Sequence, residues 1–458
     1  MVRVIPTILY LLSELVGDVS IEQVDSANQN GILLEMVQVL TDLDLVISKS
    51  YISSDGGWFM DVFHVTDQLG NKVTDDILIH YIQQALCPGR SPGKAKVKAK
   101  AKAKEVQKSL GRMVGPSFVC TDLTTLEMTA NDRPGLLSEV SAVMAELGFH
   151  VAAAEAWTHN HRAACIIYVE DELTGGGPIT DRDRLTHAEE QLEHVVGAHH
   201  GVGESMRVSL TPPASGRIHP ERRLHQLMYA DRDYEECESC SSNSSSNKTL
   251  YGTQVSIENC SEKGYSVVNM RSRDRPKLLF DTVCTLTDMQ YVVFHAAVSS
   301  KGSFAVQEYY IRHKDGCTLD TESERQRVSQ CLIAAIERRV SHGLRLDIHT
   351  RDRVGLLSDV TRIFRENGLA VSRAEIGTRG ERAIGSFYVT DASGNEVDPR
   401  TIQLLRNEIG ETVLEVNNSQ VWLPRSMAEP TPVKPYSLST LLWSQLERFS
   451  SNFSSIKS

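Results

Sequence analysis

Apolar positions along the chain switch between the spacing of a helix and the spacing of a strand. After a polar turn ending at Gly31, one helix face is marked by Ile32, Leu33, Met36, Val39, Leu40 and Leu43. Two strand-like runs follow at 46–52 and 58–66, joined by an Asp55-Gly56 hairpin signal. A second helical pattern covers 76–86. This stretch predicts a β-α-β-β-α unit with room for a closing strand.

The same order of elements recurs four times, and a short phrase marks each copy between its first strand and first helix. The phrase reads Asn131-Asp132-Arg133-Pro134-Gly135-Leu136-Leu137 in the second copy. It returns at 273–279 and 351–357, with a looser version at 27–33. Because a phrase repeated at domain-sized intervals indicates repeated structural units, we predict an α+β fold of four tandem ferredoxin-like βαββαβ repeats.

The repeats divide the chain into eight segments. We expect an atypical N-terminal segment (1–19), repeat one (20–86), a lysine-rich linker (87–116), repeat two (117–210), a linker with a short helix and a serine-rich run (211–262), repeat three (263–341), repeat four (342–424) and a C-terminal tail (425–458).

Composition narrows the function classes. The net charge of -11 and the pI near 5.8 argue against bulk binding to nucleic acid or anionic membranes. The lysine run between 94 and 108 is interpreted as a flexible insert, with a nucleic-acid, lipid or nuclear-import patch as the alternative. The N-terminal apolar run is too short to span a bilayer. We expect a cytoplasmic protein, with the nucleus as a further location.

Cysteine usage points the same way. The nine cysteines have no regular spacing, which is typical of reduced thiols in an intracellular protein. Cys237 and Cys240 form one C-x-x-C pair, but no second ligand pair lies at the spacing that a zinc site needs. We therefore expect no metal and no cofactor.

The repeated phrase resembles the signature of the ACT domain, a small regulatory module that binds amino acids. The run 57–67, Gly-Trp-Phe-Met-Asp-Val-Phe-His-Val-Thr-Asp, and the segment 222–235 are similar to those of plant ACT-domain-repeat proteins. The resemblance implies a non-catalytic sensor of a small amino acid, with glutamine and nitrogen metabolism as the suspected context. It also implies side-by-side pairing of repeats. Since repeats three and four are nearly contiguous, we expect these two to pair, leaving one with two.

Backbone chemistry explains why such a turn suits an amino acid. The free N–H groups and positive dipole end of the first helix can hold a carboxylate, glycine admits the ligand to the main chain, and a nearby Asn or Asp can bind the ammonium. The candidate ligand-binding residues are Asn28, Asn30, Gly31, Asn131, Asp132, Gly135, Leu136, Asp352, Gly355 and Leu356. The competing interpretation is that the aspartates are only turn and N-cap residues.

Repeat three differs from the others at one position of the phrase. It carries Lys277 where the other copies carry glycine, so we expect a structural role there, with an ammonium–carboxylate contact as the alternative.

Three other functions remain to be weighed against a sensor. Similar ACT pairs end a bacterial uridylyltransferase, where they follow catalytic domains. Here the repeats fill nearly the whole chain and leave no room for such a domain, so an enzyme is disfavoured. An RNA-binding protein shares the element order, yet Phe59 and Phe63 share one strand face with Asp61 between them, and basic partners are absent. A ligand-free interaction scaffold is the main alternative. The expected partners are an amino acid, a further protein and a second copy of the chain, without membrane or nucleic acid.

Overall fold

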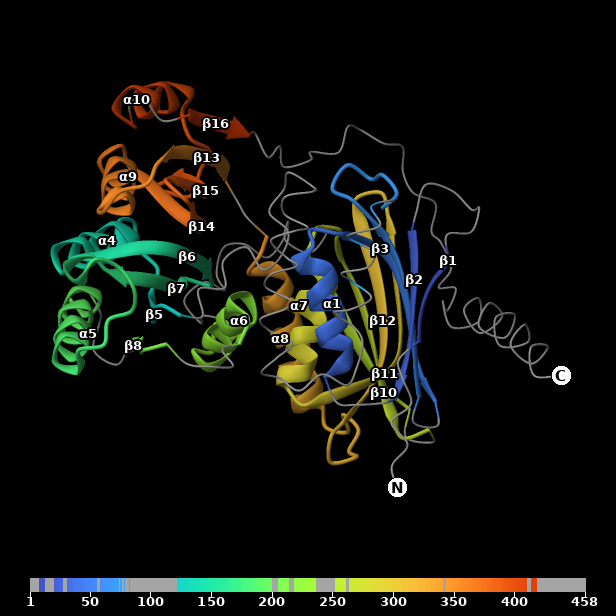
Figure 1. The fold of residues 1–458 in the computed structure, drawn as a ribbon. Helices are drawn as coiled ribbons and strands as arrows, with labels where there is room; N and C mark the ends of the chain where they lie inside the picture. Colours follow the sequence, from blue (N-terminus) through green and yellow to red (C-terminus); the bar gives the residue numbers. More distant parts are fainter. Residues whose placement is uncertain are drawn as a thin grey trace. The chain divides into compact units, whose positions relative to one another are not determined.

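The computed structural model describes residues 8–12, 20–27, 31–55, 58–73, 75, 78, 82, 122–199, 205–213, 218–235, 252–260, 263–340, 343–409 and 413–417 (Figure 1). The lysine-rich insert, Asn28, Asn30, the Cys237–Cys240 pair, the C-terminal tail and most of the expected second helix of repeat one lie outside these residues.

Repeats two and four have the expected order, and their expected helix faces are buried. Repeat two comprises β5 (Thr124–Asn131), α4 (Leu136–Glu146), β6 (Phe149–His159), β7 (Arg162–Asp171), α5 (Arg182–Gly197) and β8 (Arg207–Thr211). Repeat four comprises β13 (Leu344–Arg351), α9 (Leu356–Glu366), β14 (Leu369–Arg379), β15 (Arg382–Asp391), α10 (Pro399–Ile409) and β16 (Val413–Asn417). Val140 and Met144 of α4 and Phe364 of α9 pack in the cores because they recur at helical spacing.

In repeats one and three, the outer strand comes before the first repeat strand instead of after the second helix. Repeat one comprises β1 (Ile8–Leu12), β2 (Ser20–Ala27), α1 (Ile32–Asp42), β3 (Val46–Asp55) and β4 (Trp58–Thr66). Repeat three comprises β9 (Gln254–Cys260), β10 (Tyr265–Arg273), α7 (Leu278–Asp288), β11 (Tyr291–Lys301), β12 (Phe304–His313) and α8 (Glu322–Glu337).

The expected boundaries are therefore wrong at two places, because residues 8–12 of the segment 1–19 and residues 254–260 of the linker 211–262 are strands of repeats one and three. The short helix expected in that linker is present at 220–230. Strand β1 pairs antiparallel with β2, and β9 pairs antiparallel with β10. The outer position requires only a strand antiparallel to its neighbour, and a strand joined by a short turn before β10 fills it as well as one after α8.

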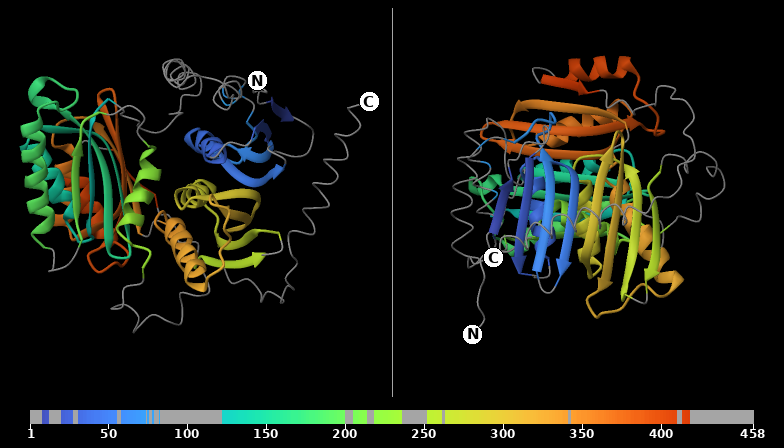
Figure 2. Two further views of the ribbon diagram at one scale, coloured as in Figure 1. Left: turned by 90° about the horizontal axis from the view of Figure 1, so that it is seen from below. Right: turned by 90° about the vertical axis from the view of Figure 1, so that its right-hand side faces the viewer.

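The strands form two eight-stranded sheets, β1-β2-β4-β3-β11-β12-β10-β9 and β16-β13-β15-β14-β6-β7-β5-β8 (Figure 2). Repeat one thus joins repeat three through β3 and β11, and repeat two joins repeat four through β6 and β14. The expected pairing of repeat three with repeat four is wrong. Because β9 already fills the edge of repeat three, the chain passes from α8 directly to β13 in the other sheet.

Helix α6 (Pro220–Ala230) contacts both sheets' repeats. Its Leu224, Leu227 and Met228 pack on Trp157 and Ile166 of the second sheet. This is the face of β6 and β7 opposite to the core that contains α4 and α5. The same helix also packs against α7 of repeat three, so it touches elements of both ACT-like pairs.

Candidate functional site

The four β–α turns share one backbone feature, a left-handed residue directly before the helix. The residues are Gly31, Gly135, Lys277 and Gly355, with φ values of 92°, 85°, 65° and 75°. None of these four helices has a side-chain hydrogen bond at its N-cap. The aspartates of the phrase therefore do not cap the helices, and the interpretation of them as N-cap residues is wrong.

At the turn of repeat two lies a pocket of about 550 Å³, counted with its open mouth, which we call the repeat-2 pocket. Asp132, Gly135 and Leu136 line it from repeat two, and repeat four contributes Thr361 and Arg365. The stem of Arg365 lies over the turn, because a Cβ at Gly135 would come within 2.8 Å of the Arg365 Cδ. Glycine is therefore needed here both for its backbone angle and for the close approach of another chain segment.

The acid of this pocket is perturbed by its surroundings. Protein atoms around the Asp132 carboxyl shield it in part from water and raise its pKa to about 6, although the residue as a whole is exposed. His161 and the backbone N–H of Arg133 act in the opposite direction. A raised pKa means that the surrounding protein groups compensate the ionised form poorly. An ammonium group placed beside Asp132 would supply that compensation.

A matching pocket of about 560 Å³, the repeat-4 pocket, lies at the turn of repeat four. Asp352, Gly355 and Leu356 line it, and repeat two contributes Ala145 at the position that Arg365 holds in the other pocket. Here the acid already has a partner, because the Nε2 of His150 lies 3.0 Å from the Asp352 carboxylate. The two pockets are therefore unlike: the paired repeat adds Arg365 to the repeat-2 pocket, whereas it adds Ala145 to the repeat-4 pocket and binds the acid there through His150.

Repeat three has a smaller pocket of about 400 Å³, the repeat-3 pocket, lined by Asp274, Arg275 and Lys277 and closed by Thr41 of repeat one. The Lys277 ammonium forms an ion pair with Glu221 of α6. Burial alone would lower the pKa of Lys277, but Glu221 raises it above its ordinary value. This ion pair is a contact within the protein, which matches the structural role expected for Lys277; binding of a ligand carboxylate by its ammonium stays a prediction.

The remaining candidate residues from the sequence are Asn131, Gly31, Asn28 and Asn30. Asn131 does not line the repeat-2 pocket; its side-chain oxygen accepts a hydrogen bond from Arg162. Gly31 stands directly before α1, as expected, and its backbone is left-handed. Asn28 and Asn30 lie outside the described residues, so their place in the site stays a prediction.

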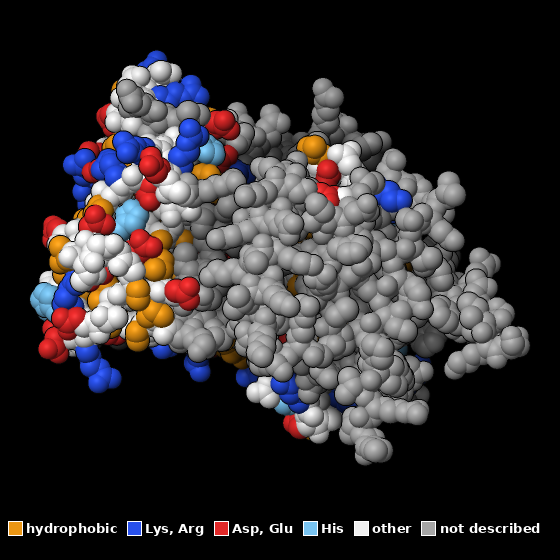
Figure 3. Space-filling model, in the orientation of Figure 1, with side chains coloured by type: hydrophobic (Ala, Val, Ile, Leu, Met, Phe, Trp, Pro, Cys, Tyr) orange, Lys and Arg blue, Asp and Glu red, His pale blue; other side chains and the backbone are white. Residues whose placement is uncertain are grey.

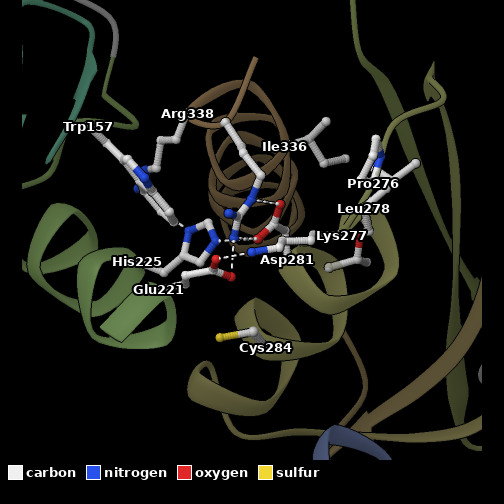
Figure 4. A network of polar contacts seen from close by, with 12 residues as sticks. Trp157, Glu221, His225, Pro276, Lys277, Leu278, Asp281, Cys284, Ile336 and Arg338 are labelled. Atoms are coloured by element: carbon white, nitrogen blue, oxygen red, sulfur yellow. Dashed lines mark hydrogen bonds and ion pairs between the residues drawn. The ribbon is translucent and has the colours of Figure 1, made fainter. Parts of the chain in front are cut away.

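Arg339 is the centre of a buried network of charges. Its partners Glu221 and Asp281, with His225, are labelled in Figure 4. Arg339 donates to the Asp281 carboxylate at 2.7 and 2.8 Å and to Glu221 at 2.9 Å. His225 lies 2.8 Å from Asp281, and Arg275 lies 2.8 Å from the same carboxylate. Burial would raise the pKa of Asp281, but Arg339 and Arg275 hold it well below its usual range. The carboxylate is thus ionised and shared by three partners.

Sequence reasoning missed most of these side chains. Arg365 and His150 reach the pockets from the paired repeat, and Arg339 reaches the network from the segment after α8. No local pattern marks them, because their roles depend on which repeats pair. Only Lys277 carried a signal, as the exception to the repeated glycine.

Comparison with known proteins supports the repeat assignment. Residues 16–92 match the model of the "ACR family N-terminal ACT domain", and residues 345–410 match the model of the "ACT domain". The chain is 55% identical over 393 residues to the ACT domain-containing protein ACR3 of Arabidopsis thaliana, covering 86% of this chain and 83% of that protein. It is 50% identical over 450 residues to ACR1 of the same plant, covering 95% and 92%.

A more distant match is the bifunctional uridylyltransferase/uridylyl-removing enzyme of Azospirillum brasilense, 22% identical over 215 residues. That alignment covers 47% of this chain and 20% of the enzyme. Fold, turns and matches define a protein built from ACT domains, in which pairs of repeats form sheets with pockets at the shared boundary. The chain belongs to the ACR family of plant ACT domain-containing proteins.

Proposed function

We propose that this protein is a non-catalytic regulatory protein that binds a small amino acid, glutamine being the first candidate, in the repeat-2 pocket. The observation that carries the proposal is the combination of Asp132, Gly135 and Arg365 around one pocket. A free amino acid presents an ammonium and a carboxylate on one carbon. Asp132 is the partner for the ammonium, and Arg365 with the N-terminal N–H groups of α4 is the partner for the carboxylate.

The repeat-4 pocket is the weaker candidate for the same ligand. His150 already occupies one face of Asp352, and Ala145 supplies no positive charge. A ligand ammonium would have to displace the imidazole, and the cation that lines this pocket, Arg353, already pairs with Asp359. We therefore assign the tighter binding site to the repeat-2 pocket and a second, weaker binding site to the repeat-4 pocket.

RNA binding draws little support from the described surface. Phe63 is 1% exposed in the core of the first sheet. On the face shown in Figure 3, acidic and basic side chains are interspersed over the described residues. Ion pairs such as Arg133–Glu139 and Arg353–Asp359 likewise place opposite charges side by side. Nucleic acid needs a continuous basic surface.

The helices in the described part of the chain include none with the length and apolar character of a membrane span.

The test is a thermal-shift screen of the twenty amino acids, since a ligand that binds only the folded state raises the melting temperature. Asp132→Asn and Arg365→Ala should each weaken the affinity of the best amino acid at least about tenfold, because each removes a charge-assisted hydrogen bond worth roughly 1.5–3 kcal/mol.

The matched control is Arg362→Ala on the same helix, whose partner is Asp359 and which does not line the pocket. It should leave the shift unchanged. If no amino acid raises the melting temperature of the wild-type protein, the sensor proposal fails and the ligand-free scaffold takes its place.

A further inference from the structure

The repeat-2 pocket and the buried charge network share one pair of strands. Trp157 of β6 and Arg373 of β14 are register partners, and both line the pocket. The side chain of Trp157 lies on the other face of the sheet, packed on α6. Because successive side chains of a strand point to opposite faces, the neighbouring Ala156 and Thr158 serve the pocket side. One strand pair thus separates pocket from network.

The strand β14 is irregular at this place. Its register with β15 shifts between Val371 and Arg373, a β-bulge at Ser372. The hydroxyl of Thr158 donates to the Ser372 carbonyl at 3.0 Å, and both residues line the repeat-2 pocket. Bulges next to binding sites redirect side chains. Here the redirected residue is Arg373, which points away from the pocket towards the network.

Direct contacts continue from these strands to Arg339. The Arg373 guanidinium donates to the Arg339 carbonyl at 3.1 Å, and the Arg339 guanidinium lies 4.7 Å from the Trp157 ring centroid. His225 meets the same ring edge-on, with centroids 4.9 Å apart. Arg339 is therefore held on one side by the wall of the repeat-2 pocket and on the other by Asp281 and Glu221.

The far end of the network is the repeat-3 pocket. Arg275, which lines that pocket, pairs with Asp281 and donates to the Ile336 carbonyl at 2.7 Å. Lys277, which also lines it, pairs with Glu221. Arg339 binds both carboxylates, so any shift of its guanidinium changes the partners of Arg275 and Lys277 together.

Burial makes the network act as one unit. Asp281 is fully buried, and Glu221 and Arg339 keep 7% and 3% of their side chains exposed. A charge left without partner at such depth is strongly disfavoured, so these groups keep their contacts by moving together.

We propose that the repeat-2 pocket and the repeat-3 turn are energetically coupled through Trp157, Arg339 and the Asp281–Glu221 carboxylates, so that a ligand in the repeat-2 pocket stabilises the β–α turn of repeat three. The proposal rests on the proposed function for its ligand. The proposal also assigns a role to Lys277. Where the other repeats have glycine, repeat three has a lysine whose ion pair with Glu221 connects its turn to α6.

The experiment is hydrogen exchange on the full chain, with and without saturating L-glutamine as the probe. We expect exchange to slow at residues 132–140, which reports binding, and at least about fivefold at 274–281, which reports coupling. Lys277→Gly restores the glycine of the other repeats. It should leave the protection at 132–140 intact and reduce the protection at 274–281, where Arg275 still pairs with Asp281.

Three results would overturn the coupling. Protection at 132–140 without any at 274–281 separates the two sites. Protection at 274–281 that survives Asp132→Asn shows glutamine bound directly in repeat three. Protection at 274–281 that is undiminished in Lys277→Gly removes the network from the path.

If glutamine protects neither segment, the proposed function fails for glutamine. In that case a double-mutant cycle measured without ligand tests the coupling. Thr158→Val removes the hydrogen bond to the bulge and Lys277→Gly the ion pair to α6, and the two residues share no contact. The change in exchange rate at 274–281 in the double variant should differ from the product of the two single-variant changes by more than about fivefold. A double-variant change within about twofold of that product would refute the coupling.

Discussion

Asp61 provides a direct test of how the first sheet is packed. It lies in β4 with 0% of its surface exposed, on the same face as the core residues Phe63 and Val65. Neither carboxylate oxygen accepts a hydrogen bond of ordinary geometry from the described residues. Burial raises its pKa to about 8, and the nearby backbone N–H of Ser53 only partly opposes this. The folded protein therefore holds Asp61 as the neutral acid.

The sign and size of the effect follow from that pKa. A group whose folded pKa lies above its unfolded value of 3.8 stabilises the protein fully below that value, and the stabilisation is lost as pH rises towards 8. Each pH unit within this window corresponds to about 1.4 kcal/mol. Between pH 5 and pH 7 the contribution of Asp61 should fall by about 3 kcal/mol, as an upper value.

The perturbation is Asp61→Asn, which has the shape of the neutral acid but does not titrate. We expect the variant to melt somewhat above the wild type already at pH 5, which lies above 3.8, and by several degrees more at pH 7, measured by scanning calorimetry. Glu35→Gln, an exposed change on α1 of the same repeat, controls for the loss of one negative charge. A difference between Asp61→Asn and wild type that stays constant from pH 5 to pH 7 would refute the reasoning.

Three further predictions concern the turns and the pockets. The affinity for the best amino acid should fall as pH drops below about 6, because Asp132 becomes protonated; titration calorimetry at pH 5 and pH 7 measures this, and equal affinities would exclude Asp132 as the ammonium partner. Gly355→Val puts a β-branched residue at φ 75° and should remove any thermal shift that arises in repeat four, whereas an unchanged shift would locate the ligand elsewhere. Gly343→Ala would bring a Cβ within 2.2 Å of the Val389 carbonyl oxygen and should destabilise the fold by at least about 2 kcal/mol in urea unfolding. Gly394→Ala, also at positive φ but in open space, should cost only about 1 kcal/mol, and equal costs would contradict the close contact.

The sequence by itself determined the repeated unit. The helical spacing of apolar residues after each turn, the strand alternation and the glycine before each first helix are local signals, because they depend on backbone geometry within one repeat. They placed the first helices of all four repeats and the left-handed turn residues Gly31, Gly135 and Gly355. They also singled out Lys277 as the exception.

Only the tertiary structure decided which repeats pair and what completes each pocket. Edge strands of four similar units can pair in several ways, and nearness along the chain favoured the wrong one. The outer strands β1 and β9 lie before their repeats, which frees the chain after α8 to enter the other sheet. Once repeat two lies beside repeat four, Arg365 and His150 reach pockets that are more than two hundred residues away in sequence. Since such contacts are set by sheet register and burial, no local pattern could have shown them.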